Sequence, residues 1–164
     1  MPNPYNYYFL EETQSYYFIT KNNIEYKIVF IIDHTFSSIS NIKIDNVFQL
    51  VIEKMTDIIE QFDSQVSETI KDIVISFFKN ELNSMIYVCD NEDSKGHVRF
   101  NVFERWYQSS SLLETITKID NVISFDSNGN ETVIYTSLLY HNENINKDTI
   151  VEIYNTMQEI LNEK

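Results

Sequence analysis

Alternation of apolar and polar residues predicts β-strands in the first third of the chain. Two short polar stretches, EETQS and KNN, are typical of hairpin turns between segments rich in β-branched and aromatic residues. These segments are residues 5–10, 16–20 and 24–33. The segment NVFQLVIEK at residues 46–54 has apolar side chains at successive positions, as in strands covered on both faces. We therefore expect a β-meander whose fourth strand lies near the middle of the sheet.

Helical spacing replaces this alternation after residue 63. In DSQVSETIKDIVISFFKNELN, apolar residues recur every three or four positions, with Asp63 or Ser64 available as N-cap and Glu68 in the first turn. The apolar stripe comprises Val66, Ile70, Ile73, Val74, Phe77 and Phe78. A similar stripe follows an available cap at Asn146 and predicts a C-terminal helix. It comprises Ile150, Ile153, Tyr154, Met157, Ile160 and Leu161.

The remaining apolar segments predict three more strands. SMIYVCD is typical of a short buried strand that ends at Asp90. ITKIDNVISFD and ETVIYTSLLYH are joined by SNGN, in which Asn128 and Gly129 are a strong signal for a tight hairpin turn. Runs of strands ahead of isolated helices favour one α+β domain over residues 1–164, with a mainly antiparallel sheet and about three helices.

Several scarce residues lie together in YVCDNEDSKGHVRFNVFERWY, residues 87–107. This stretch holds the one cysteine, the one tryptophan, both arginines and one of the two glycines. Its second half fits a strand, because apolar residues alternate over 98–102. It also fits a helix, because apolar residues recur at helical spacing through Phe103 and Tyr107. We favour the helix, with Asp93 or Ser94 as its cap.

Two interpretations of this stretch differ in what its residues do. In the structural one, Arg99 projects over the preceding turn and binds Asp90 and Asp93 with its forked donors, while Cys89 is a buried strand residue. In the functional one, consecutive Arg, Trp and Tyr residues form an exposed anchor, because these types dominate interface hot spots. The expected partner-binding set is Asp90, Glu92, Asp93, Arg105, Trp106, Tyr107 and Tyr140. Exposure of Trp106 distinguishes the two interpretations.

The net charge of −13 limits the classes of partner. Acids occur from Glu11 to Glu163, so the long-range field is negative and repels DNA, RNA and anionic membranes. Acidity of this kind serves solubility, or it marks a surface that docks on a basic protein. The densest acid rows are Asp57, Glu60 and Asp63, and Asp90, Glu92 and Asp93. Both rows are too short for close mimicry of a phosphate backbone.

Cysteine content and segment lengths indicate a compartment. One cysteine forms neither an internal disulfide nor a CxxC pair, which favours a reducing environment. The N-terminus lacks a basic segment followed by an apolar run, and no stretch approaches the ~18 apolar residues of a membrane span. Alanine is absent, a bias typical of AT-rich coding DNA in bacteria and phages. We therefore expect a cytoplasmic protein.

Motifs for catalysis and cofactor binding are missing. There is no P-loop, nucleophile elbow, HExxH helix or GxGxxG turn, and two glycines are too few for a glycine-rich phosphate loop. The histidines, His34, His97 and His141, lack the spacing of metal ligands. We expect neither a metal nor a cofactor.

Two catalytic constellations remain to be weighed. A nucleophilic Cys89 assisted by His97 needs a depressed thiol pKa, which the acids at residues 90–93 oppose. A metal-independent ribonuclease needs an acid–base pair and cations, which His97, Arg99 and Tyr107 would supply. The negative charge of the chain opposes the approach of RNA to such a site.

A set of patterns runs along nearly the whole chain. It begins with Tyr16, Phe18 and Thr20, and continues with VFQLVIEK, VSETIKDIVISFF, IYVCDNEDSKGHVRFNVFERWY and YTSLLYHNEN. The most specific part is the spacing of Cys89, Asp90, Asp93, Arg99, Phe103 and Trp106. In these patterns the chain resembles a family of small bacterial proteins of unknown function, found mainly in Bacteroidota. The resemblance implies a host range and no catalytic residue.

We therefore expect a non-enzymatic protein-binding module. Its most concrete form is an acidic inhibitor that docks on a basic nucleic-acid-handling effector, by analogy with anti-CRISPR and other phage counter-defence proteins; RNA-guided type VI-B nucleases are the expected targets. A housekeeping or antitoxin-like interaction protein is the first alternative, and a small metal-independent ribonuclease is the second. The edge strand at residues 5–10 would allow a homodimer.

Overall fold

The computed structural model describes residues 2–91 and 93–162, and it describes their side chains except at 127 and 160–162. These residues form seven strands and five helices. The strands are β1 (Tyr7–Leu10), β2 (Ser15–Ile19), β3 (Glu25–Ile32), β4 (Val47–Lys54), β5 (Ser84–Cys89), β6 (Ile116–Ser127) and β7 (Asn130–His141). The helices are α1 (Thr35–Ile39), α2 (Ser64–Phe77), α3 (Gly96–Gln108), α4 (Leu112–Thr115) and α5 (Lys147–Asn162).

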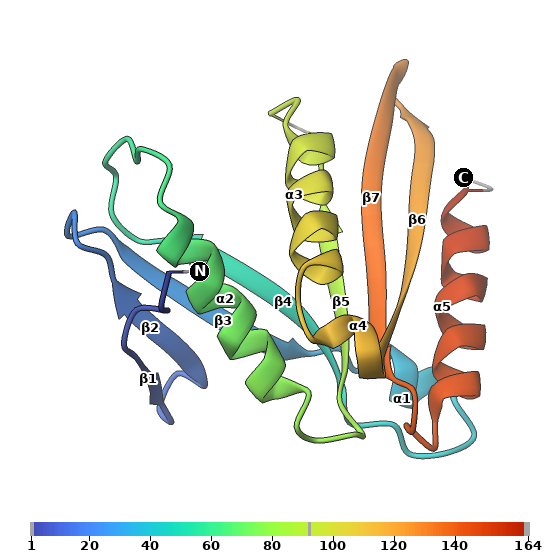
Figure 1. The fold of residues 1–164 in the computed structure, drawn as a ribbon. Helices are drawn as coiled ribbons and strands as arrows, with labels where there is room; N and C mark the ends of the chain where they lie inside the picture. The colour runs from blue at the N-terminus through green and yellow to red at the C-terminus, as the bar shows by residue number, and fades with distance from the viewer. Residues whose placement is uncertain (1, 92, 163–164) are drawn as a thin grey trace.

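All seven strands lie in one sheet, in the order β1-β2-β3-β4-β5-β7-β6 (Figure 1). Neighbouring strands are antiparallel except β4 and β5, which are parallel because the chain crosses over through α2 between them. The α+β class, the meander of β1 to β4 and the central place of β4 are confirmed.

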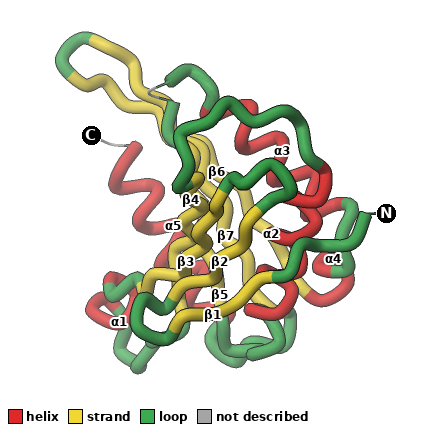
Figure 2. The backbone as a smooth tube through the Cα atoms, turned by 90° about the vertical axis from the view of Figure 1, so that its left-hand side faces the viewer, coloured by secondary structure: helices red, strands yellow, loops and turns green. Residues whose placement is uncertain are grey.

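Helices cover the sheet from both sides. In Figure 2, α2, α3 and α4 lie to the right of the sheet, and α1 and α5 lie to its left. The first core, under α2 and α3, includes Phe18, Ile28 and Leu139, all of which are buried. The second core, under α5, includes Leu138 and Tyr154. Because successive strand residues point to opposite faces, Leu138 and Leu139 of β7 each serve a different core.

Two local predictions, the N-cap of α2 and the turn between β6 and β7, are confirmed. Asp63 is the N-cap of α2, with extended backbone and a carboxylate that accepts from the Gln65 N–H at 3.0 Å. Asn128 and Gly129 have φ values of 54° and 83°, as a tight hairpin turn requires.

The expected cap of α3 was wrong, and two helices were missed. Lys95 precedes α3 as its N-cap and makes no side-chain capping bond, while Ser94 takes a φ of 61° in the turn before it. The missed helices, α1 and α4, have only five and four residues, too short to show a helical period. The preference for a helix over residues 97–107 is confirmed.

Among residues 2–91 and 93–162, the apolar helices are all too short to cross a lipid bilayer.

Candidate functional site

The loop between β5 and α3 is held by Arg99. Its Nη1 donates to Asp93 Oδ2 at 2.8 Å and its Nη2 to Asp93 Oδ1 at 3.2 Å, the bidentate contact expected from the sequence. Nη2 also donates to the backbone carbonyl of Asp90 at 2.9 Å. The guanidinium lowers the pKa of Asp93 to about 2. Arg99 therefore fixes the acidic loop from the first turns of α3.

Side chains of the loop also bind the start of α3. Asp93 Oδ1 accepts from the Lys95 N–H at 3.0 Å, and Asn91 Oδ1 accepts from the Gly96 N–H at 3.2 Å. These bonds satisfy donors that a helix N-terminus leaves without partners. Glu92, expected on a partner-binding surface, lies outside the described residues.

Cys89 is buried at the end of β5, with 2% of its surface exposed. Burial raises the pKa of its thiol, although Tyr87 and Arg99 act in the opposite direction. A buried, protonated thiol is a poor nucleophile. Cys89 thus has the environment of a small apolar core residue.

We predict that Cys89 resists alkylation in the native protein. Incubation with iodoacetamide at neutral pH should leave the intact mass unchanged over the time in which the urea-unfolded chain is fully modified. Mass spectrometry of both samples measures this, and the unfolded sample is the control for reagent activity. Rapid modification of the folded protein would contradict the prediction.

The expected three-residue anchor on α3 is not exposed as a unit. Arg105 is exposed and Trp106 is half-buried, but Tyr107 is buried and its hydroxyl donates to the Ile116 carbonyl at 2.6 Å. Consecutive helical residues are 100° apart, so residues 105 and 107 point to nearly opposite sides of α3, and it is Tyr107 that faces the sheet. The prediction for Tyr107 is corrected: it is a core residue. Tyr140 is partly buried against the second core.

Trp106 and Arg105 line a groove between the two helices of the first layer. The groove has a volume of about 550 Å³, and its other lining residues come from the loop before α2 and from the two helices. They are Glu60, Gln61, Phe62, Asp63, Val66, Ser67 and Val102. We call this the α2/α3 groove. Trp106 also packs against Phe103 of the first core, with ring centroids 6.2 Å apart.

The loop over residues 55–62, beside the α2/α3 groove, carries apolar side chains in full contact with water. Ile59 is 96% exposed and Phe62 is 94% exposed. Met55 and Ile58 are each about half exposed. Asp57, Glu60 and Asp63 alternate with these apolar residues along the chain, and Glu60, Phe62 and Asp63 are among the residues that line the groove. Sequence analysis noted the acids as a row but missed the exposure of the apolar residues between them.

Glu60 ties this loop to the sheet. Its Oε2 accepts a hydrogen bond from the hydroxyl of Tyr26 on β3. Its Oε1 is buried and accepts no hydrogen bond from the described residues. Burial and then the negative charge of Asp63 raise the pKa of Glu60. A nearby cation would stabilise the ionised form of such a carboxylate.

A charged network under α3 was also missed. The side chain of Lys118 is 2% exposed, and its ammonium binds both Glu104 and Asp120. It lies 5.2 Å from the ring centre of Phe100 and 5.9 Å from that of Tyr107. Burial of Glu104 raises its pKa, but hydrogen bonds from Lys118 and Gln108 outweigh burial, and the pKa lies below its ordinary value. Only the alternation of Lys118 and Asp120 on one strand face hinted at this cluster.

The ribonuclease constellation is not assembled. His97 and Tyr107 lie ten residues apart on α3, about 15 Å along its axis. The Tyr107 hydroxyl and the Arg99 guanidinium are bound to the Ile116 carbonyl and to Asp93, while His97 Nε2 lies 3.1 Å from Asn101 Nδ2. Within the described part of the chain, His, Cys, Asp and Glu form no group of three that would hold a metal ion.

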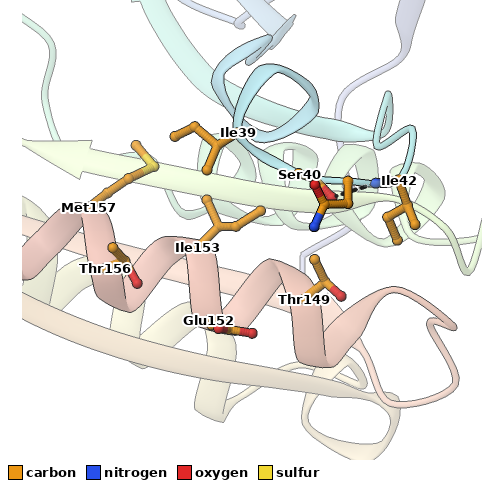
Figure 3. Close-up of a pocket in the computed structure, with 9 residues that line it drawn as sticks. Ile39, Ser40, Ile42, Thr149, Glu152, Ile153, Thr156 and Met157 are labelled. Atoms are coloured by element: carbon orange, nitrogen blue, oxygen red, sulfur yellow. Dashed lines mark hydrogen bonds between the residues drawn. The ribbon is translucent and has the colours of Figure 1, made fainter.

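A second hollow lies on the other face of the molecule, between α5 and the turn after α1 (Figure 3). Its volume is about 410 Å³. The lining is mostly apolar and hydroxyl-bearing: Ile39, Ser40, Asn41, Ile42, Thr149, Glu152, Ile153, Thr156 and Met157. Ser40 Oγ accepts from the Ile42 N–H at 3.1 Å. Among these lining residues, Glu152 is the one that carries a charge.

Comparison with known proteins supports the family resemblance. No match was found among curated proteins or among solved structures. One family model, described as a family of unknown function (DUF6169), matches residues 62–156, which is more than half of the chain. The match runs from the groove loop at Phe62 through α2, β5, α3, α4, β6 and β7 into α5. The chain therefore belongs to the DUF6169 family.

Proposed function

We propose that this protein is a protein-binding module that docks on a basic partner through the α2/α3 groove. The observation that supports this most strongly is the almost full exposure of two apolar side chains: Phe62, which lines the groove, and Ile59, which precedes the lining residue Glu60 in the chain. Because they are so exposed, these two side chains contribute almost nothing to the stability of the fold. Burying such a side chain against a partner contributes roughly 1.5–3 kcal/mol.

The composition of the groove suits an interface hot spot. Trp106 and Arg105 belong to the residue types that contribute most to binding, and Trp106 is held in place by its contact with the first core. A half-buried indole with fixed packing loses little conformational entropy when a partner covers its exposed edge. The groove thus combines fixed aromatic surface with a loop that carries protruding apolar groups.

Charge defines the class of partner. Three carboxylates, Asp57, Glu60 and Asp63, alternate in the sequence with the apolar groups, and the whole chain carries a net charge of −13. Basic proteins are attracted by this field, and nucleic acids are repelled by it. Burial and the negative charge of Asp63 raise the pKa of Glu60, so positive charge brought near by a partner stabilises the ionised form of this carboxylate. The partner class is therefore a basic, nucleic-acid-handling protein of the bacterial cytoplasm, with an RNA-guided nuclease inhibited by the acidic chain as the specific case.

The test is an affinity pull-down with three baits from a lysate of the native host. They are the unmodified protein, the Ile59→Ala/Phe62→Ala double variant, and Ile145→Ala. Residues 59 and 62 contribute little to the fold, so the double variant should fold normally. Its affinity for the partner should be lower by a factor of about 30 or more. Ile145 is 85% exposed outside the groove, which makes Ile145→Ala the matched control.

Salt dependence completes this test. Once the retained protein is identified by mass spectrometry and purified, its association rate with the chain should fall as salt is raised, because electrostatic steering is screened. A basic nucleic-acid-binding protein that only the groove variant fails to retain supports the proposal. Equal retention by all three baits, or an association rate that is insensitive to salt, contradicts it.

A further inference from the structure

We propose that two copies of this chain associate through the face of β1 to β4 that no helix covers. The apolar side chains of this face are Tyr8, Leu10, Tyr17, Ile19, Val29, Ile31 and Val51. We call this surface the bare face. It lies on the opposite side of the sheet from α2 and the α2/α3 groove, so this inference is independent of the proposed function.

Strand register places these residues on one side of the sheet. Tyr8 lies opposite Tyr17, Tyr17 opposite Lys27, and Lys27 opposite Glu53, so the four strands present one row of side chains to the same face. The next row contains Leu10, Val29 and Val51. The intervening residues on the other side, such as Phe18 and Ile28, belong to the first core under α2.

Helical cover of this side ends at β4. In Figure 1, α1 and α5 lie on the right, beside β6 and β7, whereas β1, β2 and β3 lie on the left. Within residues 2–91 and 93–162, the second core takes only Val47 from the first four strands, where β4 begins. Beyond it the face meets water: Ile19 is 54% exposed and Ile31 is 51% exposed. Tyr8 and Tyr17 stack with ring centroids 5.7 Å apart on this open surface.

Exposed apolar surface of this extent marks an interaction site. The four strands are four, five, eight and eight residues long, so with about 4.8 Å between strands and 3.3 Å per residue they cover roughly 400 Å². This flat area is about half of the ~800 Å² per partner that a standard interface buries, which is the size of a weak, concentration-dependent interface. A second copy of the same face would complete a sandwich of two sheets, with strands crossing at about 30°.

The charges of the bare face favour a second copy over the basic partner of the groove. The face carries one cation, Lys27, directly opposite the anion Glu53, with Glu25 two residues along β3. It is therefore nearly neutral, although the whole chain carries −13. Repulsion between two copies is weakest where the local charge is balanced, and a basic protein is attracted instead to the acidic loops. A near-neutral apolar face is complementary to itself.

The experiment is sedimentation velocity from low to high micromolar concentration on the full chain and four variants. The bare-face variants are Ile19→Lys and Ile31→Lys, and the controls are Ile59→Lys and Ile145→Lys. All four substitutions remove one exposed isoleucine and make the chain less negative by the same amount. A loss of association confined to the bare-face pair therefore results from the position of the substitution. Circular dichroism of each variant confirms that the sheet is retained.

The unmodified chain and both controls should reach twice the 19.5 kDa mass of one chain, and both bare-face variants should remain at the monomer mass. If the unmodified chain stays monomeric over the whole concentration range, the proposal is overturned. This holds whether the bare face has no partner or binds a different protein. A dimer that survives both bare-face substitutions but is lost in Phe9→Pro forms through the edge of β1, and it also overturns the proposal.

Discussion

Replacement of Gly96 by alanine is expected to lower the free energy of unfolding by about 3 kcal/mol, the upper end of the usual cost of overpacking. A Cβ at this position would meet the Asp90 carbonyl oxygen at 2.1 Å and its carbonyl carbon at 2.8 Å. Both atoms belong to the backbone, so no side-chain rotation relieves the clash. Urea denaturation followed by circular dichroism measures the effect through the midpoint.

The clash at Gly96 involves the same backbone carbonyl that Arg99 binds. The same Asp90 carbonyl accepts from Arg99 Nη2, so the loop cannot retreat from the new Cβ without losing this bond. The cost of Gly96→Ala should therefore be smaller in an Arg99→Met background, where the Asp90 carbonyl has already lost its bond to the guanidinium. Additive effects of the two substitutions would contradict this coupling.

Gly129→Ala is the matched control. No atom lies within 4 Å of a Cβ built at Gly129, whose φ is +83°, so the cost is the left-handed backbone alone. About 1–2 kcal/mol is expected. If Gly96→Ala proves no more destabilising than Gly129→Ala, the close approach of the loop to α3 is not the reason for glycine at position 96.

Replacement of Lys118 by methionine is expected to destabilise the protein by about 2–3 kcal/mol. Removing one partner of a fully buried ion pair costs about 3–5 kcal/mol, because the other charge remains without compensation. Here the carboxylates of Glu104 and Asp120 are 36% and 41% exposed, so water compensates part of the loss. Methionine keeps the unbranched stem that packs between Phe100 and Tyr107 and removes the charge.

Lys43→Met is the control for this substitution. Lys43 is 83% exposed and pairs with Asp45 on the surface, so its removal should change stability by no more than about 0.5 kcal/mol. Urea midpoints of both variants provide the comparison. An unchanged or raised midpoint for Lys118→Met would mean that an apolar residue serves this position as well as the network does, as happens at some buried ion pairs.

Local patterns in the sequence predicted most of the secondary structure. The acidic cap at Asp63, the helical stripe that follows it and the Asn128-Gly129 turn each depend on contacts within a few residues, so their signals are present in the chain itself. α1 and α4 were missed because one helical turn has no period to detect. The cap of α3 was mispredicted because the turn residues Asn91 and Asp93 bind its first donors from outside the helix.

The candidate site was predicted only in part. The bidentate contact of Arg99 followed from spacing, because both partners lie within one loop and one turn of helix. Tyr107 was misplaced because the choice between Trp106 and Tyr107 for the core depends on which side of α3 faces β6. The α2/α3 groove joins residues 60–67 to residues 102–106, and no local pattern connects segments so far apart.

The sequence by itself determined the strands, the three longer helices, the α+β class and the negative field, since these follow from propensity, periodicity and total charge. Tertiary structure alone decided which apolar residues remain in water. Ile59 and Ile31 have the same chemistry as buried Ile28 and Ile73, and only the positions of the helices separate them. Exposure depends on which elements pack against a residue, and that is set by the sum of long-range contacts.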